Sequence, residues 1–263
     1  MWAAVMALPK KFSVDGEILQ QRQRMKDVYE LTVRCATIPG LAAPGQFAQV
    51  GLPEGDVILR RPLGIAEHDE GKGTITFFYR VVGRGTKLLS THRTGDRLSI
   101  LGPLGHGFTE KAARPLLVGG GMGLSPLLSW AKEFPGKADV LMGGKTAEEL
   151  FWQDDFRECV KEVHITTDDG SLGEKGFTVA LLPRLLETND YDAIITCGPE
   201  IMMRSVAKIA AEAKLPCQVS LERRMGCGLG ACLSCSIDST DGRRLKVCKD
   251  GPVFWAQDVL LNN

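Results

Sequence analysis

The sequence predicts an antiparallel β-barrel, then a doubly wound parallel α/β sheet, then a small cysteine-rich domain. Short β-rich runs separated by glycine and proline fill the N-terminal part, which is typical of a barrel or sandwich. Strand-like and helix-like runs then alternate, which is typical of a parallel sheet covered on both faces. Four of the eight cysteines lie between residues 227 and 248. We expect domain limits at 12–110, 111–216 and 217–263, after a poorly ordered leader over 1–11.

The composition is that of an ordinary globular protein. The chain has 263 residues, of which 44% are hydrophobic and 24% charged, and this length suits two domains with a small appendage. Lys+Arg and Asp+Glu each total 32. Because there is no basic excess to neutralise phosphates, we expect no nucleic-acid partner.

The N-terminus is apolar over residues 1–8, but it has no preceding basic region, and Pro9-Lys10-Lys11 ends it too soon for a membrane span. The cysteines are too sparse for a disulfide scaffold, and their clustering favours a reducing compartment. We therefore expect a cytoplasmic protein that does not itself bind a membrane, which leaves association through a partner open.

The barrel strands are expected over residues 26–36, 45–50, 73–82 and 96–101. Three segments of this region have features of a binding site: Arg61-Pro62-Leu63-Gly64 after a strand, Phe78-Tyr79-Arg80 at a strand end, and Gly83-Arg84-Gly85-Thr86 before an apolar run. Arginine can grip a phosphate with a bidentate fork, an aromatic face can stack on a ring, and small residues that open a helix leave N–H groups free for an anion. Each segment alone is also compatible with a plain surface turn or loop.

The second domain begins with a strand over 115–118 that runs into a glycine-rich turn. Further strands are expected over 138–142, 162–167, 192–197 and 218–221, with helices over 127–134, 148–160, 177–186 and 200–214. Ligands of such sheets bind at the carboxyl ends of the strands, where glycines let pyrophosphate approach the backbone. The turn supplies Gly119, Gly120, Gly121 and Gly123, and the fourth strand ends in Cys197-Gly198. The turn is not a strict G-x-G-x-x-G, and Cys197 also fits the interpretation of an ordinary buried thiol.

The C-terminal cysteines are Cys227, Cys232, Cys235 and Cys248, spaced C-x4-C-x2-C-x12-C. The first three match the plant-type [2Fe–2S] ligand run, and an Asp241-Gly242 hairpin would return the fourth to them. A zinc site, a disulfide pair and unrelated buried thiols remain alternatives, although structural zinc usually shows two C-x2-C knuckles.

The three barrel segments, in this order and spacing, resemble the flavin-binding barrel of the ferredoxin–NADP reductase superfamily. The resemblance implies that Arg61 and Thr86 meet the FAD diphosphate and that Leu63 and Tyr79 lie along the isoalloxazine and ribityl groups. The full set of expected FAD-binding residues is Arg61, Pro62, Leu63, Gly64, Phe78, Tyr79, Arg80, Gly85 and Thr86. Gly64 departs from the family's Ser or Thr, so a hydroxyl near flavin N5 is expected to be missing.

The glycine turn resembles the same superfamily's Gly-Gly-Gly-x-Gly-x-x-Pro, and Cys197-Gly198-Pro199 resembles its fourth strand end. The resemblance implies NAD binding by Gly119, Gly120, Gly121, Gly123, Cys197 and Gly198, with Cys197 near the nicotinamide. After the second strand there is Lys145 but no arginine cluster for the 2′-phosphate of NADP. The residues therefore do not decide between NAD and NADP. Hydride transfer to a flavin requires no strong acid or base, and none is evident.

Over residues 12–260 the chain resembles the electron-transfer subunits of NAD-linked dihydroorotate dehydrogenase. This resemblance implies a relay from FMN in a separate catalytic subunit, through [2Fe–2S] and FAD, to NAD+ in pyrimidine biosynthesis. It also implies a heterotetramer of two plus two subunits and a cluster placed between the flavin and the partner. A related FAD/[2Fe–2S] subunit of a sulfide dehydrogenase, hydrogenase or bifurcating transhydrogenase is the alternative, and a non-enzymatic zinc module is a further one.

Overall fold

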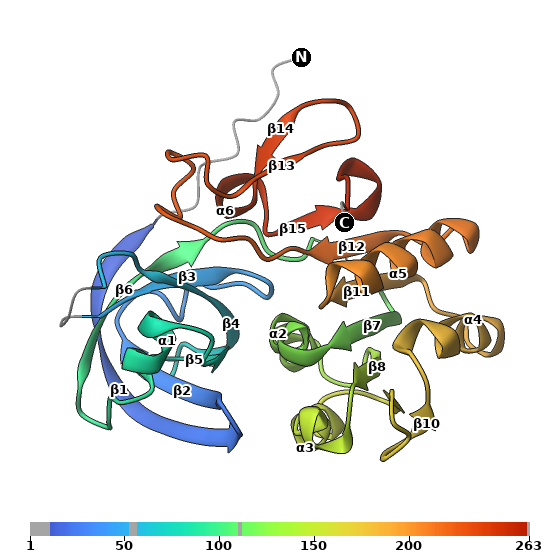
Figure 1. Cartoon of the computed structure of the whole chain (residues 1–263), viewed down its shortest axis with the longest axis horizontal. Helices are drawn as coiled ribbons and strands as arrows, with labels where there is room; N and C mark the ends of the chain where they lie inside the picture. The colour runs from blue at the N-terminus through green and yellow to red at the C-terminus, as the bar shows by residue number, and fades with distance from the viewer. Residues whose placement is uncertain (1–10, 53–56, 110–111, 262–263) are drawn as a thin grey trace.

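The computed structural model describes residues 11–52, 57–109 and 112–261, so most of the predicted leader lies outside the described residues. Six strands close into an antiparallel barrel in the order β1-β2-β5-β4-β3-β6. Figure 1 shows the barrel beside a parallel sheet, with the C-terminal segment lying over the junction between them. The barrel strands are β1 (Phe12–Met25), β2 (Val28–Cys35), β3 (Phe47–Gly51), β4 (Arg61–Asp69), β5 (Thr74–Arg80) and β6 (Arg97–Leu104).

The prediction that Arg61 follows a strand is wrong, because Arg61 opens β4. Pro62 is tolerated in this strand because β4 pairs with β5 only from Ile65 onward, so no N–H is needed on that side. Beyond β5, the predicted helix start is confirmed by α1 (Arg84–Leu89), whose Leu89 packs in the barrel core.

The sheet has the order β10-β9-β8-β7-β11-β12-β15. All five predicted parallel strands are present: β7 (Pro115–Gly120), β8 (Asp139–Gly144), β9 (Val163–Thr167), β11 (Ala193–Cys197) and β12 (Cys217–Ser220). Two short strands at the edges were not predicted, β10 (Glu174–Lys175) and β15 (Val253–Trp255). Because β15 pairs antiparallel with β12, the C-terminal segment is an extension of the sheet, and the predicted domain limit at 216/217 stays a prediction.

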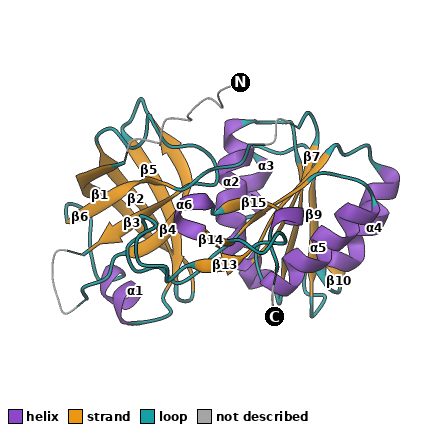
Figure 2. Ribbon diagram, turned by 90° about the horizontal axis from the view of Figure 1, so that it is seen from above, coloured by secondary structure: helices purple, strands orange, loops and turns teal. Residues whose placement is uncertain are grey.

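Helices cover both faces of the sheet, as Figure 2 shows. Alternation along β7 divides its side chains between two cores: Leu116 and Val118 pack with α4 (Thr178–Thr188) and α5 (Glu200–Glu212), and Leu117 packs with α2 (Leu124–Glu133) and α3 (Gln153–Arg157).

The predicted helix over 148–160 is broken into a 3-10 turn, η2 (Ala147–Leu150), and the short α3. Leu150 and Trp152 are both fully buried. Residues two apart do not share a helix face, so one continuous helix would not bury both.

The C-terminal segment forms the predicted hairpin, with β13 (Ser236–Asp238) paired to β14 (Arg244–Lys246). Gly242 in its turn has φ +82°, which glycine adopts without strain. The chain continues through α6 (Val247–Asp250), β15 and η3 (Ala256–Asp258). Among the described helices, none is both long enough and apolar enough to cross a membrane.

Candidate functional site

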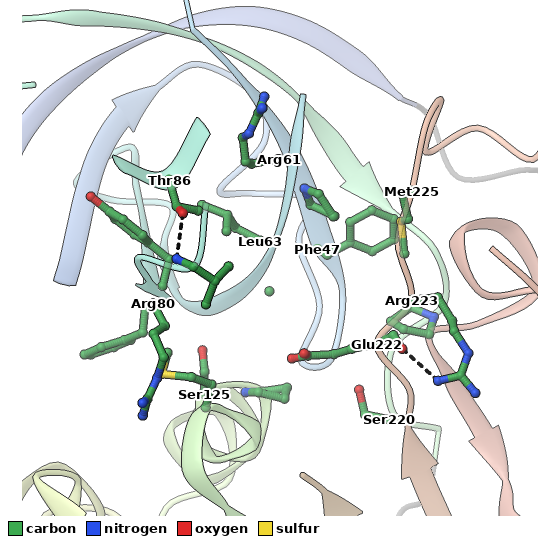
Figure 3. A pocket seen from close by; sticks show the side chains of 18 of the residues that line it. Phe47, Arg61, Leu63, Arg80, Thr86, Ser125, Ser220, Glu222, Arg223 and Met225 are labelled. Carbon is green, nitrogen blue, oxygen red and sulfur yellow. Dashed lines mark hydrogen bonds between the residues drawn. The ribbon is translucent and has the colours of Figure 1, made fainter. Parts of the chain in front are cut away.

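A cavity of about 650 Å³ opens between the barrel, the start of α2 and the chain that follows β12. Figure 3 shows side chains from all three segments converging on it. All nine residues predicted to bind FAD line this first cavity. The sequence patterns of the barrel therefore come together in one place, although their roles toward a flavin stay a prediction.

Arg61 is one of four arginines that line the first cavity. Its guanidinium lies against Gly85, where an added Cβ would overlap it. The Nη1 atom is buried and has no hydrogen-bond partner among the residues described, and burial lowers the pKa of Arg61. A partly buried guanidinium with a buried, unmet donor fits a phosphate group. The Thr86 hydroxyl accepts hydrogen bonds from the N–H groups of Val82 and Gly83, at 3.0 and 3.2 Å, and thereby shapes the turn beside it.

Tyr79 and Phe78 belong to different parts of the cavity wall. Tyr79 stacks on Tyr29 with ring centroids 5.6 Å apart, and its hydroxyl donates to Gln21 Oε1 at 3.2 Å. Burial raises the pKa of Tyr79, so this phenol stays protonated. Phe78 instead packs against Trp152 of the second domain, with centroids 4.6 Å apart. Phe78 thus links the two domains as well as lining the cavity.

Gly64 leaves open space, because an added Cβ would meet no atom within 4 Å. Ser125, which lines the same cavity from α2, is 4% exposed and has a buried hydroxyl without a partner in the described chain. Sequence reasoning missed Ser125, because serine in an apolar helix start carries no signal of its own.

A second cavity of about 730 Å³ lies at the carboxyl ends of the parallel strands. Of the residues predicted to bind NAD, four line it: Gly120, Gly121, Gly123 and Gly198. Arg80, Met122 and Glu222 line both cavities, so the two adjoin. Adjoining cavities are the arrangement that direct hydride exchange between two bound rings requires.

Gly119 and Cys197 line neither cavity. An added Cβ at Gly119 would lie 2.6 Å from Leu124 and 2.7 Å from Leu127, so this glycine lets α2 pack on β7. Cys197 is 1% exposed, and burial raises the pKa of its thiol. The prediction that Cys197 lies at the nicotinamide stays a prediction.

Glu222 projects into the first cavity (Figure 3). Glu222 is exposed, and desolvation by the protein around its carboxyl group raises its pKa. Next to it, Arg223 pairs with Glu200 at the start of α5, at 3.0 Å. Asp168 and Glu149 line the second cavity together with Glu222. Sequence reasoning did not assign roles to Glu222 or Glu149.

The four predicted metal ligands lie close together, three of them in the loop over residues 227–235 and Cys248 in α6, and none of the eight cysteines is in a disulfide. Their thiols interact in two pairs, Cys227 with Cys232 and Cys235 with Cys248. Two pairs of thiols suit two iron ions with two cysteines each.

Each of the four sulfurs also accepts a backbone N–H. The donors are Leu229 and Ala231 to Cys227 (3.3 and 3.4 Å), Cys227 to Cys232 (3.4 Å), Cys248 to Cys235 (3.5 Å) and Gly230 to Cys248 (3.1 Å). Such donors stabilise thiolates and tune iron–sulfur clusters. Hydrogen bonds from Ser234 are the main cause that lowers the pKa of Cys232 to about 6. The donor set therefore fits a [2Fe–2S] cluster.

The cluster loop, residues 226–235, has an inner and an outer side. On the inner side, Met225 just before it lines the first cavity beside Phe47 (Figure 3). On the outer side, Cys232 is exposed, and Leu229 and Leu233 are 42% and 58% exposed. The loop thus connects the wall of the first cavity to the protein surface.

Comparisons with known proteins first define the class. Over 98% of this chain and 92% of the other, the fold matches a chain from a structure of NADH-dependent reduced ferredoxin–NADP oxidoreductase, studied for flavin-based electron bifurcation (TM-score 0.83, 30% identity). A ferredoxin NADP+ reductase from Neisseria gonorrhoeae with bound FAD and NADP shares the fold over 78% of this chain and 92% of that one (TM-score 0.64, 17% identity). The protein therefore has the ferredoxin–NADP reductase fold with a C-terminal iron–sulfur domain.

Sequence relatives then identify the particular family. Residues 222–260 match the iron–sulfur cluster binding domain of dihydroorotate dehydrogenase B. The dihydroorotate dehydrogenase B (NAD(+)) electron transfer subunit of Fusobacterium nucleatum is 34% identical over 93% of this chain and 97% of its own. The corresponding subunit of Bacillus caldolyticus is 39% identical over the same shares. The chain belongs to this family of electron transfer subunits.

Proposed function

We propose that the chain relays electrons between a dihydroorotate-oxidising partner subunit and NAD+, in the pathway of pyrimidine biosynthesis. The observation that carries this proposal is the continuous series of sites: the exposed cluster loop, the first cavity that it adjoins through Met225, and the second cavity that shares a wall with the first. Bound FAD would supply the exchange between two-electron and one-electron chemistry, and a [2Fe–2S] cluster would pass single electrons.

The barrel residues would hold FAD. Arg61, over Gly85, offers its unmet Nη1–H to the diphosphate, and Thr86 fixes the turn that bounds this end. Leu63 and Tyr79 provide the apolar wall along the ring and its chain, together with Pro62, Gly64 and Phe78, and Arg80 adds a cation to the lining. A dry, largely apolar wall keeps water from the reacting ring.

The glycines of the second cavity would hold NAD. Gly123 packs against the carbonyl of Cys197 and the N–H of Gly198, so no side chain fits there and the backbone stays open to pyrophosphate. Gly119 and Cys197 would support this surface from behind. Asp168 and Glu149 favour NAD over NADP, because a 2′-phosphate near two carboxylates is repelled.

The partner would dock over the exposed side of the cluster loop. Leu229 and Leu233 offer apolar contact on either side of Cys232, and burial of such groups is the main drive for association. The resemblance supports an FMN-containing catalytic partner and a heterotetramer of two plus two chains. A cytoplasmic location is proposed on the same resemblance and on the clustered free thiols.

The test is to purify the chain anaerobically and record its absorbance, flavin and metal content. We expect flavin and iron–sulfur bands with one FAD and about two irons per chain. A colourless protein that contains zinc would overturn the relay and favour the zinc module. Co-expression with an FMN-containing neighbour should then give NAD+ reduction that depends on dihydroorotate.

A second candidate is a subunit of a bifurcating transhydrogenase, favoured by the 30% identity and near-complete coverage of the bifurcating oxidoreductase chain. The co-purified partner separates the two functions. A partner that oxidises dihydroorotate supports the first, and one that exchanges electrons with ferredoxin and NADPH supports the second.

A further inference from the structure

Strand β3 carries residues to both redox sites. Ala48 and Val50 point into the barrel core, so the alternate residues Phe47 and Gln49 point outward. Phe47 lines the first cavity and packs with Cys235 and Cys248 in one apolar cluster. The outer face of β3 is therefore the side of the barrel that meets the C-terminal domain.

Gln49 on this outer face is an unmet buried amide. The side chain is 0% exposed, and neither Oε1 nor Nε2 has a hydrogen-bond partner among the described residues. Burying an amide without partners destabilises a fold, and most buried side-chain polar groups are therefore paired.

Gln46, three residues earlier, shows the contrast. Its Nε2–H donates to the carbonyl of Gly105 at 2.8 Å, and its Oε1 accepts the N–H of Ala43 at 2.9 Å. Gln46 is 6% exposed, so the two glutamines differ in pairing and not in burial. The unmet amide of Gln49 points to a hydrogen-bond partner that is present only when the neighbouring site holds its ligand.

The side chain of Gln49 lies directly against Gly228 of the cluster loop. A Cβ at Gly228 would lie 2.6 Å from Nε2 and 2.7 Å from Cγ of Gln49. Gly228 has φ +70° and stands between Cys227 and Leu229, whose N–H donates to the Cys227 sulfur. Glycine at this position thus permits both the turn of the loop and the approach of the amide.

We infer that Gln49 is a positioning residue of the iron–sulfur site. When the loop holds its cluster, the Nε2–H of Gln49 donates a hydrogen bond into this site beside Gly228. This inference rests on the proposed function, since it requires a cluster in the loop. Hydrogen bonds to cluster sulfurs and their surroundings stabilise the reduced form, which carries more negative charge, and so raise the reduction potential. Gln49 would then fix the loop to the flavin barrel and raise the potential of the cluster.

The test compares Gln49→Leu with the matched control Gln46→Leu in the full-length, cofactor-loaded chain. Each change replaces a buried amide on the barrel by an apolar side chain of similar size. The readouts are the cluster reduction potential and g-values from an EPR-monitored titration, the FAD potential, the iron content and the Tm.

For Gln49→Leu we expect a cluster potential shifted to lower values and altered g-values, with the FAD potential unchanged. For Gln46→Leu we expect a lower Tm, because two satisfied barrel hydrogen bonds are lost, and an unchanged cluster potential. An unchanged potential and unchanged g-values in Gln49→Leu with full iron content would overturn the inference.

Gln49→Met serves as a second variant that fills the site with a flexible apolar chain. If both Gln49 variants lose iron while Gln46→Leu retains it, the assignment is also supported, because the amide is then required to hold the loaded loop. If all three variants lose iron, the effect is a general one of the barrel and the inference is wrong. Absence of iron from the unsubstituted chain would contradict the proposed function itself, which keeps the two failures distinct.

Discussion

In the cluster loop, three of the four cysteines lie between residues 227 and 235, whereas the first cavity takes its lining from residues as distant as Gly45 and Pro252. The loop holds its sulfurs with its own backbone N–H groups and exposes Cys232 to solvent. The cavity relies on packing, as in the contact of Phe78 with Trp152. Loss of one cysteine ligand should therefore abolish electron transfer through the loop, whereas loss of one lining residue should only partly weaken cofactor binding in the cavity.

Cys232→Ser should have the largest effect. It removes a predicted ligand at the exposed side of the loop, so coupled electron transfer to the partner should fall by at least about 100-fold, more than when a group that only hydrogen-bonds to a ligand is changed. Oxidation of NADH by an artificial acceptor should persist, because the flavin cavity is untouched. Coupled activity that survives intact in this variant would show that the cluster is not in the relay.

Arg61→Ala should come next, acting on the cavity and not on the loop. A charged hydrogen bond contributes about 1.5–3 kcal/mol, so the Kd of FAD should rise about 10- to 100-fold. Equilibrium dialysis of the deflavinated chain measures this, and iron content should not change. Arg61→Lys is the control, since it keeps the charge but not the fork, and it should show a smaller loss. Equal affinity in all three proteins would place the diphosphate elsewhere.

Asp168→Asn should change cofactor choice in the second cavity. Removing one of the three carboxylates that line it should raise the ratio of NADPH to NADH kcat/KM by about 10-fold, because like charges in close contact cost several kcal/mol. Asp154→Asn, at an exposed position outside the cavity, is the control and should leave the ratio unchanged. A ratio that stays constant in Asp168→Asn would remove Asp168 from the site of discrimination.

Gly64→Ser should have the smallest effect. Because an added Cβ meets nothing within 4 Å, the stability should stay within about 0.5 kcal/mol of the original. The new hydroxyl should tighten FAD binding by about threefold, as one modest hydrogen bond does. Differential scanning fluorimetry and FAD titration measure the two effects. A large loss of stability would mean that the open space beside Gly64 is needed by the fold.

Prediction from the sequence worked where chemistry is local. The cysteine spacing and the Asp241-Gly242 turn were found from neighbours in the chain, and the structure brings the four cysteines together and forms the hairpin. The NAD-binding role of Gly119 stays a prediction, and in the structure this glycine lets α2 pack on β7. Consecutive strand residues face opposite sides, and which glycine faces the ligand depends on how the sheet is placed.

The sequence by itself determined the two domain classes, and it predicted the four cysteine ligands and the binding segment around Arg61. Tertiary structure decided that two cavities adjoin at Glu222, that Ser125 shares the cavity of Gly64, and that Gln49 lies against Gly228. The reason is physical: ligand spacing and turn conformation depend on adjacent residues, whereas a cavity and its buried polar groups depend on packing between segments far apart in the chain.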